Sequence, residues 1–501
     1  MPLSQKSTRI ELYPPEIKGR DVVFRWDVSP SSDLYHQQTF TLSFPEPVDP
    51  TRVPERLWWT VFLLCMHSHW TILRPCTIHL PIRLPPGEAE GWRRLLDSYI
   101  ATIEAQRGGT DFERNIEILE HGKALDPIVP LEERNICAAA FSGGKDSLVQ
   151  SAMLCELRRR PILVTTTSPM PDREDHGTQH RRKVLKEICE RRDLTLLEVH
   201  SDYRSAWDNS ASGRLGYPFA INEISDTFLY TATLLAAGYA LGATHLFLAS
   251  ENEVSQNEVQ AGRFLQHKHF MYSALTQAAI GAMLAPVGLY YGSLITPLHS
   301  CQVQELLKTR YRDLKDLQFS CWRPTDDRRA CSECLECYRL AWVVMSLRGS
   351  PSDLGIDLVH LLTHRKPPSR KTNKPYPPND VVAQRLTAQV TRALLSTSFL
   401  RVLKHIATDQ PRTLFKAQGW QALRKFRAIQ KTERQEVPTL GPPLGYRAGF
   451  LTTVDPSLRE GVRAIFEQHF HREDERDYAD QLEQLTAAID WVTAPLGERG
   501  I

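Results

Sequence analysis

The sequence lacks an early apolar run that is long enough to cross a membrane. Its most apolar early stretch, residues 57–66, is far shorter than the roughly 20 residues that a membrane-spanning helix needs. The first residues, MPLSQKSTRIELYPP, show no apolar segment behind their charges and therefore no secretory signal. We expect a cytoplasmic protein without a membrane partner, in which residues 57–66 form a core helix or strand.

A strong net charge is also missing, because the formal charge is only +2 in 501 residues. Such a balance does not by itself predict a nucleic-acid binder. The charge is uneven, however: residues 365–434 contain 16 Lys or Arg residues and three acids. A basic block of this kind usually forms a solvated face, but it also fits an acidic partner such as RNA.

Cysteine is present at ten positions, which in a reducing compartment argues against a disulfide framework and for metal binding or chemistry. Four of the cysteines lie in SCWRPTDDRRACSECLECYRL with the spacing C-x9-C-x2-C-x2-C: Cys321, Cys331, Cys334 and Cys337. Four thiolates at this spacing can surround one tetrahedral Zn²⁺. We predict a structural zinc site, with an iron–sulfur cluster and uncoordinated thiols as the alternatives.

Residues 1–130 alternate short apolar runs with many prolines, a pattern that predicts strands joined by turns in an α+β accessory domain. Cys65, His67 and His69 could ligate a metal, but the aromatic segment WWTVFLLCMHSHW favours a packed core. At the other end of the chain, residues 365–380 have the composition of an exposed linker. We expect residues 380–501 to form a helical C-terminal extension.

Residues 131–350 show a different rhythm, in which short apolar runs alternate with helix-length segments. The expected strands are 136–141, 162–167, 194–199, 245–250 and 288–296, and the expected helices are 147–158, 175–191, 222–241, 262–284 and 300–314. This alternation predicts an α/β domain with a doubly wound parallel sheet. Ligands of such sheets bind beyond the carboxyl ends of the strands.

The first expected strand runs directly into a glycine loop, AAAFSGGKDSLVQ at residues 138–150. Glycine can turn the backbone sharply and bring N–H groups against an anion, and a helix that starts at Ser147 adds its dipole. Lys145 supplies a charge, and Asp146 could cap the helix or face Mg²⁺. We expect both of these side chains to be exposed. The candidate phosphate-binding residues are Ser142, Gly143, Gly144, Lys145, Asp146 and Ser147, with a ligand-free polar turn as the alternative.

The segment SGGKDS matches SGGxDS and resembles the PP-loop of ATP pyrophosphatases, which have the adenine nucleotide alpha hydrolase-like fold. Together with the cysteine quartet, ITPLHSCQVQE (295–305) and FSC (319–321), it resembles the 7-cyano-7-deazaguanine synthase family over roughly residues 135–345. The resemblance implies ATP, Mg²⁺ and Zn²⁺ as cofactors and Lys145 and Asp146 as catalytic residues. It also implies that ATP activates the carboxylate of 7-carboxy-7-deazaguanine as an adenylate, that ammonia then reacts to give an amide, and that a second ATP drives dehydration of the amide to the nitrile.

The sequence departs from that family at two places. SENEVSQNEVQ (250–260) replaces the usual stretch beyond the fourth strand, and Val303 stands where a lysine is expected. The resemblance therefore covers the ATP-binding half better than the later step from amide to nitrile. Glu251 and Asn252 are candidates for binding the substrate or the metal, or they simply begin a helix.

The size of the chain is similar to that of enlarged synthase-like proteins in antiphage operons, such as the Qat system and type IV CBASS. That resemblance implies a partner protein as the acyl acceptor, with the accessory domain and the basic block as surfaces for it. Three alternatives stay open: the queuosine-biosynthetic synthase itself, a PP-loop tRNA-modifying enzyme that uses a reactive cysteine outside the quartet, and a non-catalytic ATP-binding scaffold.

Overall fold

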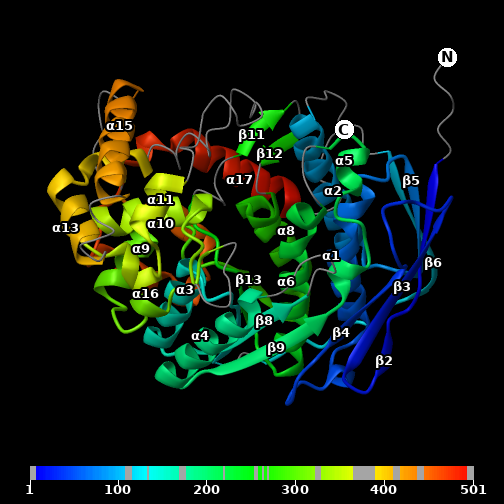
Figure 1. Ribbon diagram of the computed structural model, residues 1–501. Coiled ribbons are helices and arrows are strands. Elements are labelled where there is room, and N and C mark those ends of the chain that lie inside the picture. Colours follow the sequence, from blue (N-terminus) through cyan, green and yellow to red (C-terminus); the bar gives the residue numbers. More distant parts are fainter. Residues whose placement is uncertain are drawn as a thin grey trace.

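The computed structural model describes residues 7–107, 115–132, 135–168, 176–217, 221–252, 258–261, 264–267, 270–321, 329–364, 390–409, 418–436 and 445–493. A mixed, mostly parallel sheet of eleven strands runs through the molecule in the order β13-β10-β7-β8-β9-β4-β3-β1-β5-β6, with β2 beside β3 (Figure 1). Its strands are β1 (Thr8–Leu12), β2 (Glu16–Lys18), β3 (Asp21–Ser29), β4 (Thr39–Ser43), β5 (Cys76–Arg83), β6 (Ile116–Ala124), β7 (Ile136–Ala140), β8 (Arg160–Thr167), β9 (Thr195–Ser201), β10 (His245–Phe247) and β13 (Tyr290–Gly292).

The α/β half of the sheet consists of β13, β10, β7, β8 and β9, which are all parallel. Numbered along the chain, their order is 5-4-1-2-3, so the winding reverses between β7 and β10. The helices that follow these strands are α3 (Lys145–Glu156), α4 (His176–Arg192), α6 (Ile221–Ala240), α8 (Ala274–Leu284) and α9 (Ser300–Thr309). Side chains of α3, α4 and α9 share one apolar core, and those of α6 share another with the opposite side of the sheet. The predicted α/β class is confirmed, and its topological switch point lies between β7 and β10.

Two expected helix starts were wrong. The helix predicted over 262–284 begins at Ala274, because Ser273 caps it by accepting a hydrogen bond from the N–H of Thr276. Within the segment before it, β12 (Phe264–His267) pairs with β11 (Glu258–Ala261) as an antiparallel hairpin. The helix after the glycine loop begins at Lys145 rather than at Ser147, since Gly144 already has the extended backbone of a cap residue.

The N-terminal strands continue the same sheet. β4 pairs antiparallel with β9, where Leu42 lies opposite Ser201. The buried helix α1 (Glu55–Trp70) packs against α6, so residues 57–66 are helical, and the α2 helix (Pro86–Arg107) contacts α8. Two buried hydroxyls join the halves: Tyr203 donates to the carbonyl of Cys65 at 2.6 Å, and Tyr99 donates to that of Ile224 at 2.7 Å. The boundary proposed at residue 130 is therefore crossed by both the sheet and the core.

The C-terminal residues form two groups of helices. One group surrounds the cysteine segment and contains α10 (Leu335–Ser346), α11 (Leu358–His364), α13 (Phe399–Asp409) and α15 (Trp420–Glu436). The other group, α16 (Pro456–Glu467) and α17 (Ala479–Thr493), packs on the α/β half. The expected linker and the parts 365–389 and 410–417 of the basic block lie outside the described residues. Within the described part of the chain, no helix combines the length and apolarity needed to cross a membrane.

Candidate functional site

The glycine loop lies at the carboxyl end of β7, at the switch point. Gly143 has a left-handed φ of +78°, and a Cβ there would lie 2.8 Å from Cδ2 of Leu185, so the position requires glycine. The N–H of Gly144 donates to Oγ of Ser142 at 3.3 Å, and the carbonyl of Gly143 accepts from the N–H of Phe319 at 2.7 Å. One hydrogen bond therefore stabilises the loop internally, through Ser142. The other connects the loop to the segment that leads into the cysteine quartet.

Lys145 occupies the first turn of α3 and is buried, with 5% of its surface exposed. Its Nζ donates to Oδ1 of Asp146 at 2.6 Å and to Oε2 of Glu251 at 2.7 Å. Burial alone would lower the pKa of Lys145, but the carboxylates of Asp146, Glu251 and Glu336 raise it above its ordinary value. The expectation that Lys145 is exposed was wrong, because a cation at this edge is enclosed by acids from three separate elements.

The polar side-chain atoms of Asp146, Ser142 and Ser147 lie at the glycine loop. Asp146 is partly exposed and contacts Lys145, while Gly144 is the N-cap of α3, so Asp146 is not the capping residue. Oγ of Ser147 donates to the carbonyl of Gly144 at 3.1 Å and lies 3.4 Å from Oγ of Ser142. These hydroxyls and the N-terminus of α3 together form an arrangement that suits a phosphate group.

Glu251 and Asn252 follow β10, on the other side of the switch point from the glycine loop. Their side chains contact different parts of the structure. Glu251 reaches Lys145, so it belongs to the same cluster as the loop. Asn252 is buried and turns toward other elements: its N–H donates to the carbonyl of Leu298 at 2.8 Å, and its Oδ1 accepts from Arg447 at 3.2 Å. Of the two candidates, only Glu251 contacts a residue of the glycine loop through a hydrogen bond that the structure describes.

Glu336 is a charged member of the site that sequence reasoning missed. It lies in the first turn of α10, is buried, and lines one small cavity with Lys145, Ser300 and Gln304. Burial raises the pKa of Glu336, and Arg339 at 3.3 Å and Lys145 partly offset this effect. In the sequence Glu336 lies between Cys334 and Cys337. The cysteine spacing was enough to account for this segment, so the sequence offered no separate reason to select the carboxylate. The ammonium of Lys145 and the guanidinium of Arg339 thus face three carboxylates, and carboxylate oxygens are ligands that suit a divalent cation.

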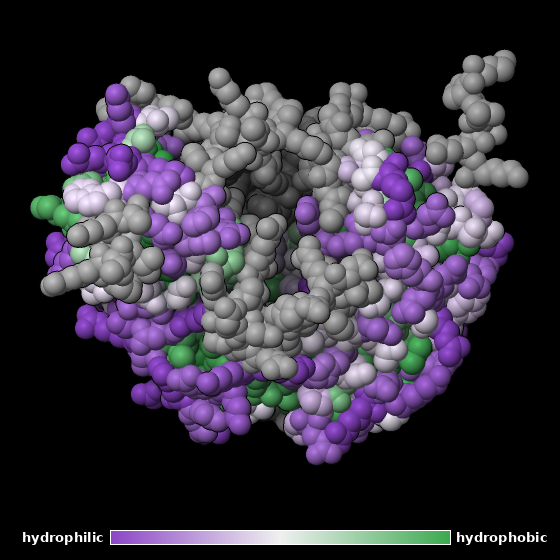
Figure 2. All heavy atoms as spheres, viewed as in Figure 1, coloured by the Kyte–Doolittle hydropathy of each residue, from purple (hydrophilic) through white to green (hydrophobic). Residues whose placement is uncertain are grey.

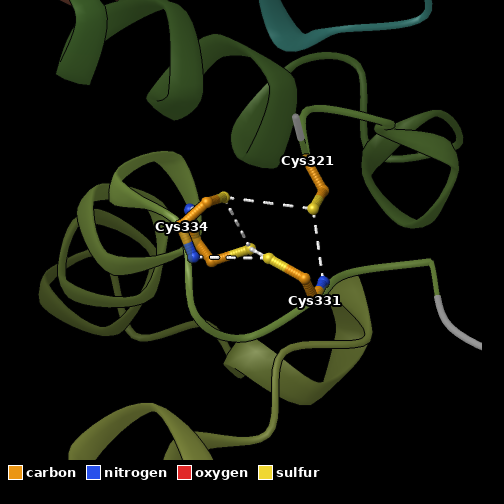
Figure 3. Close-up of side chains that lie close together, drawn as sticks. Cys321, Cys331 and Cys334 are labelled. Carbon is orange, nitrogen blue, oxygen red and sulfur yellow. Dashed lines mark hydrogen bonds between the residues drawn. The ribbon is translucent and has the colours of Figure 1, made fainter. Parts of the chain in front are cut away.

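The four cysteines predicted as metal ligands lie together (Figure 3). Their sulfur atoms are 3.5 Å apart in Cys334 and Cys337, 3.9 Å in Cys331 and Cys337, and 4.0 Å in Cys321 and Cys334. A tetrahedral site with Zn–S bonds of about 2.3 Å brings its sulfurs to roughly 3.8 Å from one another. In an iron–sulfur cluster the thiolates are divided among two or more irons, so that some of the sulfurs lie farther apart. The quartet could therefore hold a single metal ion such as zinc.

Local backbone geometry shapes this quartet. Ser332 adopts a left-handed φ of 57°, which turns the chain between the second and third cysteines. Cys334 is the N-cap of α10, and its Sγ accepts from the N–H of Cys337 at 3.5 Å. Sγ of Cys331 accepts from the N–H of Cys334 at 3.3 Å. Such backbone donors stabilise thiolate charge and hold the sulfurs on one side of the turn.

The second possible ligand group, Cys65, His67 and His69, lies inside α1 and is fully buried. Nδ1 of His67 lies 2.9 Å from the carbonyl of Leu63, and burial lowers the pKa of His67 to about 4. Within the described residues, the quartet is the His, Cys, Asp and Glu group whose donor atoms converge as metal ligands do. The interpretation of this segment as packed core is confirmed.

Two cavities accompany the site. The larger, about 780 Å³, runs along β13 between α8 and residues 452–457 and contains no residue of the glycine loop. The smaller, about 540 Å³, lies between α4 and the strands β8 and β9. There Arg181 donates to Oγ1 of Thr165 at 2.9 Å and to the carbonyl of Ser142 at 3.3 Å, which links this cavity to the loop. Figure 2 also shows a hollow in the upper middle of the face that it displays.

Comparison with models of known protein families found no match, and a search of curated proteins found no match either. The glycine loop, the charged cluster around Lys145 and the cysteine quartet therefore carry the functional argument on their own geometry.

Proposed function

We propose that the protein is an ATP-dependent, C–N bond-forming ligase of the 7-cyano-7-deazaguanine synthase type. The observation that carries the proposal is the buried Lys145, which lies at the N-terminus of α3, directly after a glycine loop, at the switch point of a doubly wound sheet. Helix N-termini and backbone N–H groups at such a point bind phosphate. The cysteine quartet, tied to the loop through Phe319, is the second feature that the resemblance requires.

In this proposal Ser142, Gly143, Gly144 and Ser147 bind the β,γ-pyrophosphate of ATP, and Lys145 balances its charge. Asp146 and Glu251 supply carboxylates for Mg²⁺, and the quartet holds a structural Zn²⁺. A carboxylate oxygen of 7-carboxy-7-deazaguanine bonds to the α-phosphorus of ATP, and pyrophosphate leaves. The amine then bonds to the acyl carbon, loses a proton to solvent, and AMP leaves with the electron pair.

The acceptor in our proposal is an amine of a partner protein, as the resemblance to the enlarged antiphage proteins implies. The biosynthetic alternative uses ammonia and continues through the amide to the nitrile. Val303, at the position where that family has a lysine, is fully buried in α9 and cannot supply a charge for the later step. This apolar substitution favours a reaction that stops at the amide.

Release of pyrophosphate from ATP and Mg²⁺, with and without 7-carboxy-7-deazaguanine, tests the proposal. We expect release only with the carboxylate, and its loss in Lys145→Met but not in Lys186→Met, an exposed lysine of α4. Mass spectrometry of co-expressed proteins then detects the transferred acyl group. ATP binding without turnover would support the scaffold alternative, and free nitrile without any modified protein would support the biosynthetic one.

One observation favours a second candidate function, a PP-loop enzyme that modifies RNA. Exposed side chains three or four positions apart form a stripe along α15: Trp420, Arg424, Arg427, Lys431 and Arg434. Positions with this spacing share one helix face, and a basic face with an aromatic side chain suits single-stranded RNA. Burial, however, raises the pKa of Cys137 to about 12, so this thiol is unsuited to sulfur chemistry.

Binding of a labelled single-stranded RNA, measured against salt concentration, tests this candidate. We expect R427E/K431E to weaken binding and lower its salt dependence, while Lys186→Glu, on α4, leaves both unchanged. Equal affinity of the two variants for RNA would remove the support that α15 gives to this function.

A further inference from the structure

The C-terminal residues reach the switch point through one arginine. Arg447 is 4% exposed, and its Nη1 lies 3.2 Å from Oδ1 of Asn252. Asn252 directly follows Glu251, whose carboxylate contacts Lys145. Arg447 is thus separated from the charged cluster by a single peptide unit, although it lies 195 positions after Asn252 in the sequence.

Asn252 joins three segments of the chain at this point. Its N–H donates to the carbonyl of Leu298 at 2.8 Å, in the loop that follows β13. The N–H of Arg447 donates to the carbonyl of Pro297 in the same loop at 3.0 Å. These hydrogen bonds therefore connect the Arg447 side chain with the backbone after β10 and the backbone after β13. They also position Glu251, which is the neighbour of Asn252 in the chain.

The guanidinium group of Arg447 is itself held firmly. Its Nε donates to Oε2 of Glu473 at 2.7 Å, and Nη1 also donates to Oε1 of Gln481 at 2.7 Å. The other oxygen of Glu473 lies 3.0 Å from Nε2 of His299, the N-cap residue of α9. The His299 ring also accepts a hydrogen bond from the N–H of Gln302, so its other nitrogen, Nε2, is the one that faces Glu473. Arg447 and His299 are buried in this network, and Glu473 and Gln481 are half-buried.

We propose that Arg447 is a positioning residue of the nucleotide site, which holds Asn252 and, through it, the carboxylate of Glu251 against Lys145. The inference rests on the proposed function, because it assigns residues 445–481 to the same site and not to a separate partner-binding unit. Loss of the guanidinium leaves Oδ1 of Asn252 and the half-buried carboxylate of Glu473 without this donor. Hydrogen bonds to charged groups are worth about a 10- to 100-fold change in an equilibrium or rate.

Arg447→Ala tests the inference in the full chain, with pyrophosphate release as the readout. We expect kcat to fall about 10- to 100-fold and to recover in millimolar guanidinium, which fills the vacated place. Arg459→Ala is the matched control, because Arg459 lies in the same C-terminal part and donates to the carbonyls of Thr452 and Val454, away from the loop. It should lose thermal stability without a guanidinium-dependent change in kcat. Wild-type kcat in Arg447→Ala, or an equal and unrescued loss in both variants, would overturn the inference.

The affinity for MgATP separates this inference from the ligase proposal. If the wild-type chain releases no pyrophosphate with the deazaguanine carboxylate but binds MgATP, the ligase proposal fails. The inference then stands if Arg447→Ala raises the Kd about tenfold and guanidinium reverses the change, and it falls if the Kd is unaltered. A wild-type chain that does not bind MgATP overturns both.

Discussion

Nζ of Lys145 lies 2.7 Å from Oε2 of Glu251, a residue 106 positions later in the chain. The contact joins the carboxyl ends of the first and fourth strands of the parallel half, and both side chains are buried. A buried ammonium needs paired charges nearby, and here it has them from α3, from the segment after β10 and from α10. The switch point of the sheet therefore brings together charged side chains from distant parts of the sequence.

Lys145→Met should affect both activity and stability. Removing the ammonium leaves the Glu251 carboxylate buried without its partner, so we expect the free energy of unfolding to fall by about 3–5 kcal/mol. Pyrophosphate release should fall by about 10²–10³-fold, as when a positioned electrostatic group is removed. Urea unfolding and the pyrophosphate assay measure the two effects separately.

The double variant K145M/E251Q provides the control for this prediction. Neutralising Glu251 removes the uncompensated charge, so the double variant should regain most of the lost stability but none of the activity. A double variant that is no more stable than Lys145→Met would show that the pair does not stabilise the fold through its charges.

Loss of the metal should loosen the helices around the quartet. We expect one metal ion per chain by elemental analysis and none in Cys334→Ser, because a tetrahedral site needs all four ligands. The variant should unfold at lower urea concentration, since α10, α11, α13 and α15 share the core beside the quartet. Cys301→Ser is the control: Cys301 packs against that core from α9 but lies outside the quartet. Visible absorbance from iron, or a full metal content in Cys334→Ser, would contradict the prediction.

The buried histidines of α1 make the fold sensitive to acid. Burial lowers the pKa of His67 to about 4 and that of His69 to about 3, whereas histidine in an unfolded chain titrates near about 6.5. Below that pH the unfolded chain binds more protons than the folded chain, so stability is lost as the pH falls from about 6.5 to about 4. The slope should approach about 1.4 kcal/mol per pH unit for each histidine.

Urea unfolding between pH 7.5 and pH 4.5 measures this slope. His67→Phe should flatten it, because phenylalanine fills the aromatic surroundings of His67, such as Phe228 at 4.2 Å between ring centroids, and does not titrate. His471→Gln, at an exposed position, should leave the slope unchanged. An unchanged slope in His67→Phe would mean that other groups cause the acid sensitivity.

The sequence was informative wherever the signal was local. Alternating apolar runs identified all five strands of the parallel half, and the cysteine spacing identified the quartet, because strand pattern and ligand spacing depend on neighbours in the chain. The αL turn at Gly143 was also foreseeable, since only glycine allows it without strain.

The features that the sequence did not reveal depend on contacts between distant segments. Lys145 has the appearance of an exposed loop residue until Glu251 and Glu336 are brought to it from two other elements. Arg447 has no recognisable motif, and its role follows only from its contact with Asn252. The pairing of β4 with β9 likewise joins Leu42 with Ser201, which lie 159 positions apart in the sequence.

Deletion of residues 1–130 should unfold the rest of the chain, contrary to what an accessory domain would allow. Without β4, the edge of β9 loses its backbone partners at Ser201, and without α1 the apolar side of α6 faces water. The Tyr203 hydroxyl also loses its buried acceptor on Cys65. We expect residues 131–501 alone to lack a cooperative urea transition.

Co-expression of residues 1–130 and 131–501 as two chains supplies the matched experiment, since it restores every one of these contacts and omits only the covalent link. The two fragments should purify together, unfold cooperatively and release pyrophosphate as the intact chain does. A cooperative transition of residues 131–501 alone, at the stability of the intact chain, would show that residue 130 is a true domain boundary. The N-terminal strands could then bind the acceptor protein without being needed for folding. If the fragment unfolds instead, only surface substitutions can test whether these strands bind the acceptor protein.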